Sequence, residues 1–180
     1  MSTHYPQTTL FIFSGLPGTG KTTLAQKLAT QTGAAYLRID TIEQSLRDFC
    51  AWQVEGEGYE LAYRLAQDNL RLGLSVVADS CNSIALTRHA WESVAKQSDA
   101  RFENIQIVCA DAAEHRTRIE TRRSTIPNLK LPSWQDVVQR DYQPWNSSCI
   151  VIDTAGKTVA ESFRSLCQKL AIALDHVSFG

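Results

Sequence analysis

Residues 15–22, GLPGTGKT, fit the pattern G-x-x-x-x-G-K-[ST], with glycine, glycine, lysine and threonine in the fixed places. An apolar run precedes the stretch and a helical pattern follows it, as the motif requires. Glycines let the loop turn its backbone N–H groups inward, and the next helix directs its positive end to the same place. The stretch therefore predicts a phosphate-binding loop. The residues expected to contact the phosphates are Gly15, Pro17, Gly18, Thr19, Gly20, Lys21, Thr22 and Thr23.

Three side chains are predicted to bind the phosphates and the metal ion at this loop. Lys21 supplies a positive charge for the β- and γ-phosphates of a nucleotide, and the Thr22 hydroxyl can ligate Mg²⁺. Asp79 ends the apolar run VVAD, where a carboxylate commonly holds Mg²⁺ directly or through water. A turn or a helix cap is the alternative role for Asp79. We expect ATP and Mg²⁺ as cofactors, Lys21 as a catalytic residue, and Thr22 and Asp79 as the metal residues.

Asp40 is the candidate general base. It ends the run LRID, which is predicted as a strand. In a doubly wound sheet the ligands lie outside the carboxyl ends of the strands. A carboxylate there can face the γ-phosphate and accept the proton of an acceptor hydroxyl. The alternative is an N-cap for a helix that begins at Thr41, and the two roles can coexist.

An arginine-rich helical pattern, EHRTRIETRRS, follows the fourth apolar run. At about 100° per residue, Arg118 and Arg122 share one face of a helix, and Arg116 and Arg123 share nearly the opposite face. The planar guanidinium fork matches phosphate oxygens. We predict Arg118 and Arg122 as catalytic residues, because the proline-containing segment that follows them is typical of a mobile lid. The alternative is an exposed helix with charge pairs four residues apart.

Short apolar runs alternate with helical patterns along the chain, which predicts an α/β fold with a parallel sheet and right-handed crossovers. The strands are expected at residues 10–13, 35–39, 75–78, 105–110 and 149–152. The helices are expected at residues 22–31, 41–50, 59–72, 83–96, 112–123, 133–142 and 158–174.

Composition narrows the class of protein. The 180 residues are 43% hydrophobic and 21% charged with a net charge of −1, so the chain lacks the basic character of many nucleic-acid-binding domains. No apolar run approaches the roughly 20 residues that cross a bilayer. The five cysteines include no C-x-x-C pair, so neither a zinc site nor a disulfide framework is indicated. We expect a cytoplasmic protein that binds neither nucleic acid nor a membrane.

Four stretches, GLPGTGKTTLA, RIDTIEQSL, VVADSCNSIALTRHAW and AEHRTRIETRR, resemble the small P-loop kinase group. This group includes polynucleotide 5′-kinase, chloramphenicol phosphotransferase, gluconate kinase and adenylylsulfate kinase. Nearly the whole chain is also similar to bacterial single-domain proteins labelled AAA-family ATPase or adenylylsulfate-kinase-like, through DTIEQSL, LPSWQDV and VIDTAG.

The resemblance implies a P-loop NTPase three-layer sandwich, in which helices cover both faces of a five-stranded parallel sheet. It implies one P-loop kinase-like domain over residues 1–180, with a small lid at about residues 111–133. It also implies phosphoryl transfer from ATP with Mg²⁺, and it places Asp153 and Thr154 near the adenine.

One departure from the group bears on the acceptor. In polynucleotide 5′-kinases an arginine three positions after the base grips a substrate phosphate, and here Glu43 holds that position. We therefore interpret the chain as a kinase that moves the γ-phosphate of ATP to a hydroxyl of a small-molecule acceptor. The acceptor pocket is expected from residues 41–63 and 124–145. The alternatives are a nucleic-acid 5′-hydroxyl kinase, and a non-catalytic or regulatory ATP-binding ATPase module.

Overall fold

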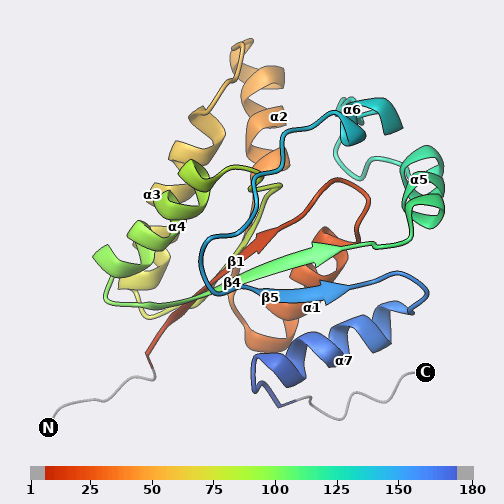
Figure 1. Ribbon diagram of the computed structural model, residues 1–180. Coiled ribbons are helices and arrows are strands. Elements are labelled where there is room, and N and C mark those ends of the chain that lie inside the picture. Colours follow the sequence, from red (N-terminus) through yellow and green to blue (C-terminus); the bar gives the residue numbers. More distant parts are fainter. Residues whose placement is uncertain (1–6, 174–180) are drawn as a thin grey trace, which may run out of the picture.

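The computed structural model describes residues 7–173 and is built around a five-stranded parallel sheet (Figure 1). The strand order is β2-β3-β1-β4-β5, and every neighbouring pair is parallel. The strands are β1 (Thr9–Ser14), β2 (Ala35–Arg38), β3 (Val76–Asp79), β4 (Arg101–Val108) and β5 (Ile150–Asp153). The parallel α/β fold expected from the sequence is confirmed.

Helices cover both faces of the sheet, which gives the expected three layers. Figure 1 shows α2, α3 and α4 on one side, α1 and α7 on the other, and α5 and α6 beyond the carboxyl ends of the strands. The helices are α1 (Lys21–Thr32), α2 (Ile39–Cys50), α3 (Glu57–Arg71), α4 (Ala85–Gln97), α5 (Ala112–Thr121), α6 (Trp134–Val138) and α7 (Val159–Lys169). None of these helices is long and apolar enough to span a membrane.

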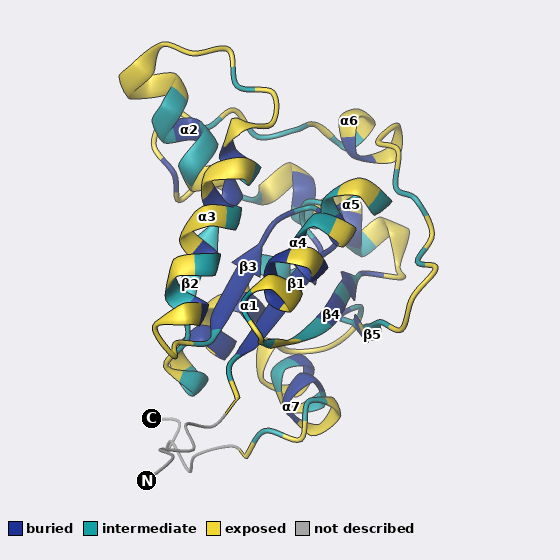
Figure 2. Cartoon of the chain, turned by 90° about the vertical axis from the view of Figure 1, so that its left-hand side faces the viewer, coloured by how far each residue is buried: buried dark blue, intermediate teal, exposed yellow. Residues whose placement is uncertain are grey.

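The central strand shows why the core divides in two. Successive side chains of a strand point to opposite faces of the sheet. Leu10 and Ile12 therefore pack with α3 and α4, while Phe11 and Phe13 pack with α1 and α7. All four side chains are buried. Figure 2 shows the central strands β1 and β3 in dark blue between helices whose outer faces are largely yellow.

Several predicted boundaries were wrong because pairing and packing decide where elements end. β4 begins at Arg101 rather than at residue 105, since residues 101–104 pair with β1. β2 ends at Arg38, and Ile39 already belongs to α2. α5 ends at Thr121, whereas the predicted helix ran to residue 123. Arg122 therefore lies after the helix and not on it. α6 is a five-residue helix within the predicted range 133–142. The last helix ends at Lys169, and position 174 of its predicted range lies outside the described residues.

Candidate active site

The loop between β1 and α1 takes the path that its glycines permit. Gly15 has φ +141°, and its N–H donates to the Cys81 carbonyl at 3.0 Å. A side chain at Gly15 would collide with the Ile107 carbonyl. Gly20 stands in the left-handed region at the N-cap of α1, with no side-chain cap. The first turn of α1 contains no acidic residue, so its free N–H groups and positive end can attract an anion.

Lys21 is held by a buried carboxylate. Its Nζ donates to Oδ1 of Asp79 at 2.6 Å, and Tyr36 donates its hydroxyl to Oδ2 of Asp79 at 2.7 Å. Burial alone would raise the pKa of Asp79, but the charge and hydrogen bond of Lys21, together with the contributions of Tyr36 and Thr22, outweigh burial and lower that pKa. Burial alone would lower the pKa of Lys21, but Asp79 raises it. Both groups are therefore charged at neutral pH.

Thr22 and Asp79 form a donor set that suits Mg²⁺. The Thr22 side chain is among the groups that lower the pKa of Asp79, so the two side chains are neighbours. Thr22 also lines the large cavity described next, whereas Asp79 lies beneath it, 1% exposed. Hydroxyl and carboxylate oxygens are hard ligands, and Mg²⁺ commonly completes its shell with water and phosphate oxygens. The residues present thus fit the predicted metal.

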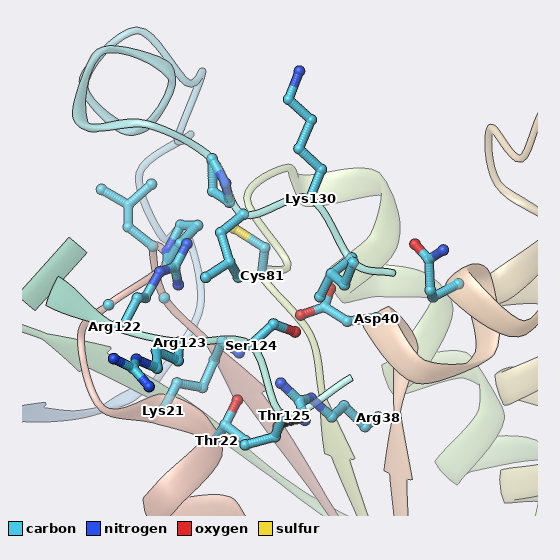
Figure 3. Close-up of a pocket in the computed structure, with 18 of the residues that line it drawn as sticks. Lys21, Thr22, Arg38, Asp40, Cys81, Arg122, Arg123, Ser124, Thr125 and Lys130 are labelled. Atoms are coloured by element: carbon cyan, nitrogen blue, oxygen red, sulfur yellow. Dashed lines mark hydrogen bonds between the residues drawn. The ribbon is translucent and has the colours of Figure 1, made fainter. Parts of the chain in front are cut away.

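A cavity of about 780 Å³ opens above the loop (Figure 3). The loop residues Lys21 and Thr22 form one wall, and Asp40, in the first turn of α2, lies across the cavity from them. Both segments expected to form an acceptor pocket contribute to the lining. From residues 41–63 come Glu43, Gln44 and Arg47, and from residues 124–145 come Ser124, Thr125, Asn128, Leu129, Lys130, Leu131, Pro132 and Arg140.

Asp40 is exposed in this cavity and is not an N-cap. The N-cap of α2 is Arg38, so the capping alternative for Asp40 was wrong. The negative charge of Asp40 favours the charged form of Lys21 and of Arg122, which places Asp40 near both cations. A carboxylate between a phosphate loop and an open cavity can accept a proton from a hydroxyl bound there.

The two predicted lid arginines have different surroundings. Arg118 donates to the hydroxyl of Thr154 at 2.8 Å and to its carbonyl at 3.0 Å, and it forms an ion pair with Glu114. Arg122 follows the end of α5 and lines the large cavity. Its Nε and Nη2 are buried without a hydrogen-bond partner among the described residues. Because the helix ends before Arg122, Arg123 also lines the cavity, although the helical pattern placed it on the other face.

Helix α5, predicted as part of a mobile lid, packs directly on the phosphate loop. A ring nitrogen of His115 lies 2.8 Å from the Pro17 carbonyl oxygen, and a side chain at Gly18 would collide with Ile119. The His115 ring also contacts Trp134 edge-on, which ties α6 to α5. The sequence analysis did not identify His115. Its spacing of four from Ile119, on one helix face, was the available signal.

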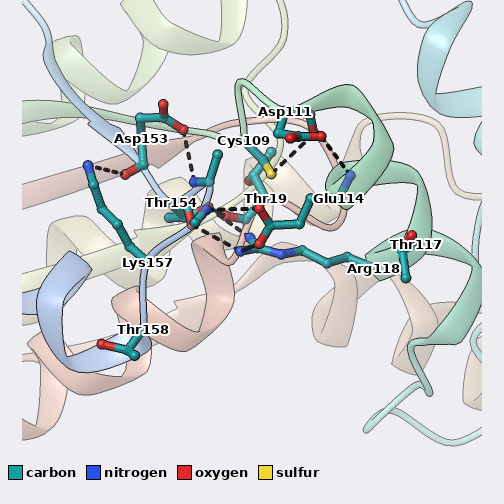
Figure 4. Close-up of polar contacts among 12 residues, drawn as sticks. Thr19, Cys109, Asp111, Glu114, Thr117, Arg118, Asp153, Thr154, Lys157 and Thr158 are labelled. Carbon is teal, nitrogen blue, oxygen red and sulfur yellow. Dashed lines mark hydrogen bonds and ion pairs between the residues drawn. The ribbon is translucent and has the colours of Figure 1, made fainter.

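A second groove of about 270 Å³ lies between the loop and the start of α7. Thr154, Arg118 and Lys157 line it together with Gly18 and Gly20. The buried Thr154 hydroxyl donates to the Thr19 carbonyl at 2.9 Å, which joins β5 to the phosphate loop (Figure 4). Asp153, which was predicted beside Thr154 near the adenine, lines neither cavity. Its carboxylate accepts from the N–H groups of Ala110 and Ala155 and closes the turn.

Arg88 is a structural feature that the sequence analysis missed. It is 3% exposed and donates to four backbone carbonyls, those of Asn82, Ser83, Gln143 and Pro144. Its guanidinium also stacks on Trp145 at 4.2 Å and on Tyr142 at 5.1 Å. Arg88 thereby fastens the segment after Arg140 to the start of α4.

Solved structures that include small kinases share this fold. A gluconokinase from Sinorhizobium meliloti has 14% identity and TM-score 0.64, covering 93% of this chain and 93% of its own. The Mycobacterium tuberculosis APS kinase CysC with AMPPNP and APS has 16% identity and TM-score 0.62, with coverages of 92% and 99%. Kti12 from Chaetomium thermophilum with ADP-AlF3 has 22% identity and TM-score 0.67, with coverages of 92% and 100%.

The chain belongs to the AAA domain family, which matches residues 10–140. No curated protein gives a significant match. The expected resemblance to the small P-loop kinase group is confirmed at the level of the fold.

Proposed function

We propose that this protein is an ATP- and Mg²⁺-dependent phosphotransferase that moves the γ-phosphate of ATP to a hydroxyl of a small molecule. The observation that carries the proposal is the cavity of about 780 Å³, which joins the phosphate loop, Asp40 and Arg122 in one space. Its size lies within the range of small-molecule sites. The kinase fold of the gluconokinase and the APS kinase supports the same chemistry.

The nucleotide would lie across the loop. Its β- and γ-phosphates meet the loop N–H groups and Lys21, as in other loops of this pattern. Its adenine would occupy the second groove, beside Thr154 and Lys157. The ADP-AlF3 and AMPPNP complexes of the structural neighbours support nucleotide binding at this fold. Thr22 and Asp79 would hold Mg²⁺, which would supply positive charge to neutralise the phosphates.

Transfer then requires positions and charges that the cavity provides. The acceptor oxygen forms the new bond to the γ-phosphorus while the bond from that phosphorus to the bridging oxygen of ADP breaks. The electron pair of the broken bond leaves with ADP, and the hydroxyl proton passes to Asp40. Lys21 meets the charge of the transferring group, whereas Arg122, whose buried Nε and Nη2 have no partner among the described residues, faces the acceptor side of the cavity. Arg118 is already engaged with Thr154 and Glu114, so it holds the nucleotide side of the site together.

The test is transfer from γ-labelled ATP with Mg²⁺ to a panel of sugars, sugar acids, nucleosides, adenylylsulfate, antibiotics and 5′-hydroxyl oligonucleotides. Asp40→Asn is expected to keep ATP affinity and to lower transfer by roughly 100-fold, because the proton acceptor is lost. Asp68→Asn, an exposed carboxylate on α3, is the matched control and should keep full activity.

Three results would contradict the proposal. Unchanged turnover in Asp40→Asn would remove Asp40 as the base. Label on oligonucleotides alone would indicate a nucleic-acid 5′-hydroxyl kinase. Release of free phosphate at one slow rate, whatever acceptor is added, would indicate a regulatory ATP-binding ATPase module.

A further inference from the structure

The large cavity carries more positive charge than its own carboxylates balance. Eight cationic side chains line it, against only two carboxylates, Asp40 and Glu43. Ion pairs join Lys21 to Asp79, Arg47 to Glu43 and Arg118 to Glu114. The other five lining cations make no ion pair within residues 7–173, and they are Arg38, Arg122, Arg123, Lys130 and Arg140.

Two of these cations, Arg122 and Arg140, line the same cavity within range of each other's charge. Burial lowers the pKa of Arg122, and the positive charge of Arg140 acts in the same direction, while Asp40 opposes both. Burial raises the pKa of the Cys81 thiol, and the positive charge of Arg140 opposes that rise. Cys81 lines the same cavity beside the phosphate loop. Arg122 and Arg140 therefore face one region of the cavity, although they come from segments on either side of α6. Two guanidinium groups repel each other unless an anion lies between them.

Arg122 and Arg140 differ in burial, but neither guanidinium group forms an ion pair in the described part of the chain. Arg122 keeps buried Nε and Nη2 donors without a partner in the described part of the chain. A buried donor left unpaired is destabilising, so a group that accepts a hydrogen bond from it stabilises the complex. Arg140 is exposed in the cavity, and no carboxylate of the described residues pairs with it.

The segment that carries Arg140 is fixed in place. Arg88 donates to the carbonyls of Gln143 and Pro144 and stacks on Trp145. Gln143 donates its N–H to the Ser83 carbonyl, and its side chain accepts from the N–H of Ala85, both at 2.8 Å. Since Ser83 follows the strand that ends in Asp79, this anchor sets the distance between Arg140 and the phosphate loop. A segment that is anchored in this way loses little backbone freedom when a side chain that it carries binds an anion.

We propose that the phosphate acceptor carries an anionic group, a phosphate, sulfate or carboxylate, which binds between Arg122 and Arg140 while its hydroxyl faces Asp40. The proposal rests on the phosphotransferase function above and names its class of acceptor. Guanidinium groups match the oxygens of all three anions through paired N–H donors. Glu43 does not oppose this binding, because its carboxylate is already paired with Arg47.

A binding experiment tests this anion site without catalysis. The protein is saturated with Mg²⁺ and AMPPNP, which fills the γ-phosphate position, and is then titrated with inorganic phosphate or sulfate by calorimetry. Wild type is expected to bind one anion. Arg140→Gln and Arg122→Gln should each weaken it by 10-fold or more, since each removes charged hydrogen bonds. Arg116→Gln removes a charge from an exposed face of α5 outside the cavity and should change nothing.

Two outcomes would overturn the anion site. One is no anion binding to the AMPPNP complex. The other is binding that survives both arginine substitutions. Failure to bind AMPPNP itself would contradict the proposed function instead, so the two failures are distinguishable.

Matched acceptors then identify the anion. Gluconate is compared with glucitol, adenosine 5′-phosphate with adenosine, and adenylylsulfate with adenosine, in the transfer assay with labelled ATP. Only the charged member of a pair is expected to serve as an efficient acceptor, with kcat/KM at least 10-fold above the neutral member. Arg140→Gln should raise the KM of that acceptor more than it lowers kcat. Equal rates for a neutral and a charged partner would overturn the proposal while leaving the kinase function standing.

Discussion

Lys21 Nζ lies 2.6 Å from Oδ1 of Asp79, and the carboxylate is 1% exposed, so the lysine of the phosphate loop is anchored by a buried charge. This pair joins the start of α1 to the carboxyl end of β3. It fixes the direction of the lysine before any nucleotide binds. A phosphate that enters the loop then meets a cation that is already ordered.

The first prediction concerns the energy of this pair. Asp79→Asn leaves the buried Lys21 ammonium without its counter-charge, so the free energy of unfolding should fall by about 3 kcal/mol. The double variant Lys21→Met with Asp79→Leu replaces both charges by apolar groups and should lie closer to wild type than Asp79→Asn does. Urea unfolding followed by tryptophan fluorescence measures all three. A single variant as stable as wild type would contradict the anchoring role.

The second prediction is a pH dependence of stability. The pKa of Asp79 is lowered from 3.8 in the native state, so its contribution to stability is present above pH 3.8 and is lost as the pH falls through the native pKa. The difference in unfolding free energy between wild type and Asp79→Asn should therefore be constant from pH 7 to about 5 and shrink below pH 3.8. Urea titrations between pH 7 and 3 measure it. A difference that grows toward acid would reverse the sign and exclude the ion pair as its cause.

The third prediction concerns the contact between Gly18 and Ile119. Gly18 has φ +82°, and a methyl group there would strike the Ile119 side chain. Gly18→Ala should cost about 2 kcal/mol or more, from backbone strain and steric clash together. In an Ile119→Ala background only the strain of about 1 kcal/mol should remain. The difference between the two costs measures how firmly α5 rests on the loop. Equal costs in both backgrounds would mean that α5 stands away from the loop in solution.

The fourth prediction concerns Arg88. Arg88→Met keeps most of the apolar stem but leaves four backbone carbonyls without their donor, so stability should fall by about 3 kcal/mol. Lys96→Met, which removes an exposed cation from the same helix, is the control and should cost far less. If Arg88 positions the segment of Arg140, the folded variant should also bind phosphate more weakly in the AMPPNP complex, while its affinity for AMPPNP stays unchanged. Unchanged phosphate affinity in a destabilised protein would assign Arg88 a purely structural role.

The sequence alone determined the parallel α/β fold and the phosphate loop, because both depend on local patterns. Nearly continuous apolar runs mark strands covered on both faces, and glycines at fixed places mark the loop. Asp40 and Asp79 could be named in advance, because the carboxyl ends of parallel strands meet at one edge. Their side chains differ all the same. Asp79 is buried against Lys21, whereas Asp40 is exposed in the cavity.

Only the tertiary structure determined the positions of the arginines that lie far from the phosphate loop in sequence. A helical pattern gives the face of a residue but not the point where the helix ends, and the end of α5 at Thr121 directed Arg122 and Arg123 into the cavity. No local pattern gave a role to Arg140 or to Arg88, although Arg88 lies within one of the stretches that resemble the kinase group. Their roles follow from the folded structure, in which Arg88 holds residues 143 and 144 against α4. Such contacts join positions more than 50 residues apart, and no local pattern encodes them, because long-range packing and charge pairing fix them only once the chain has folded.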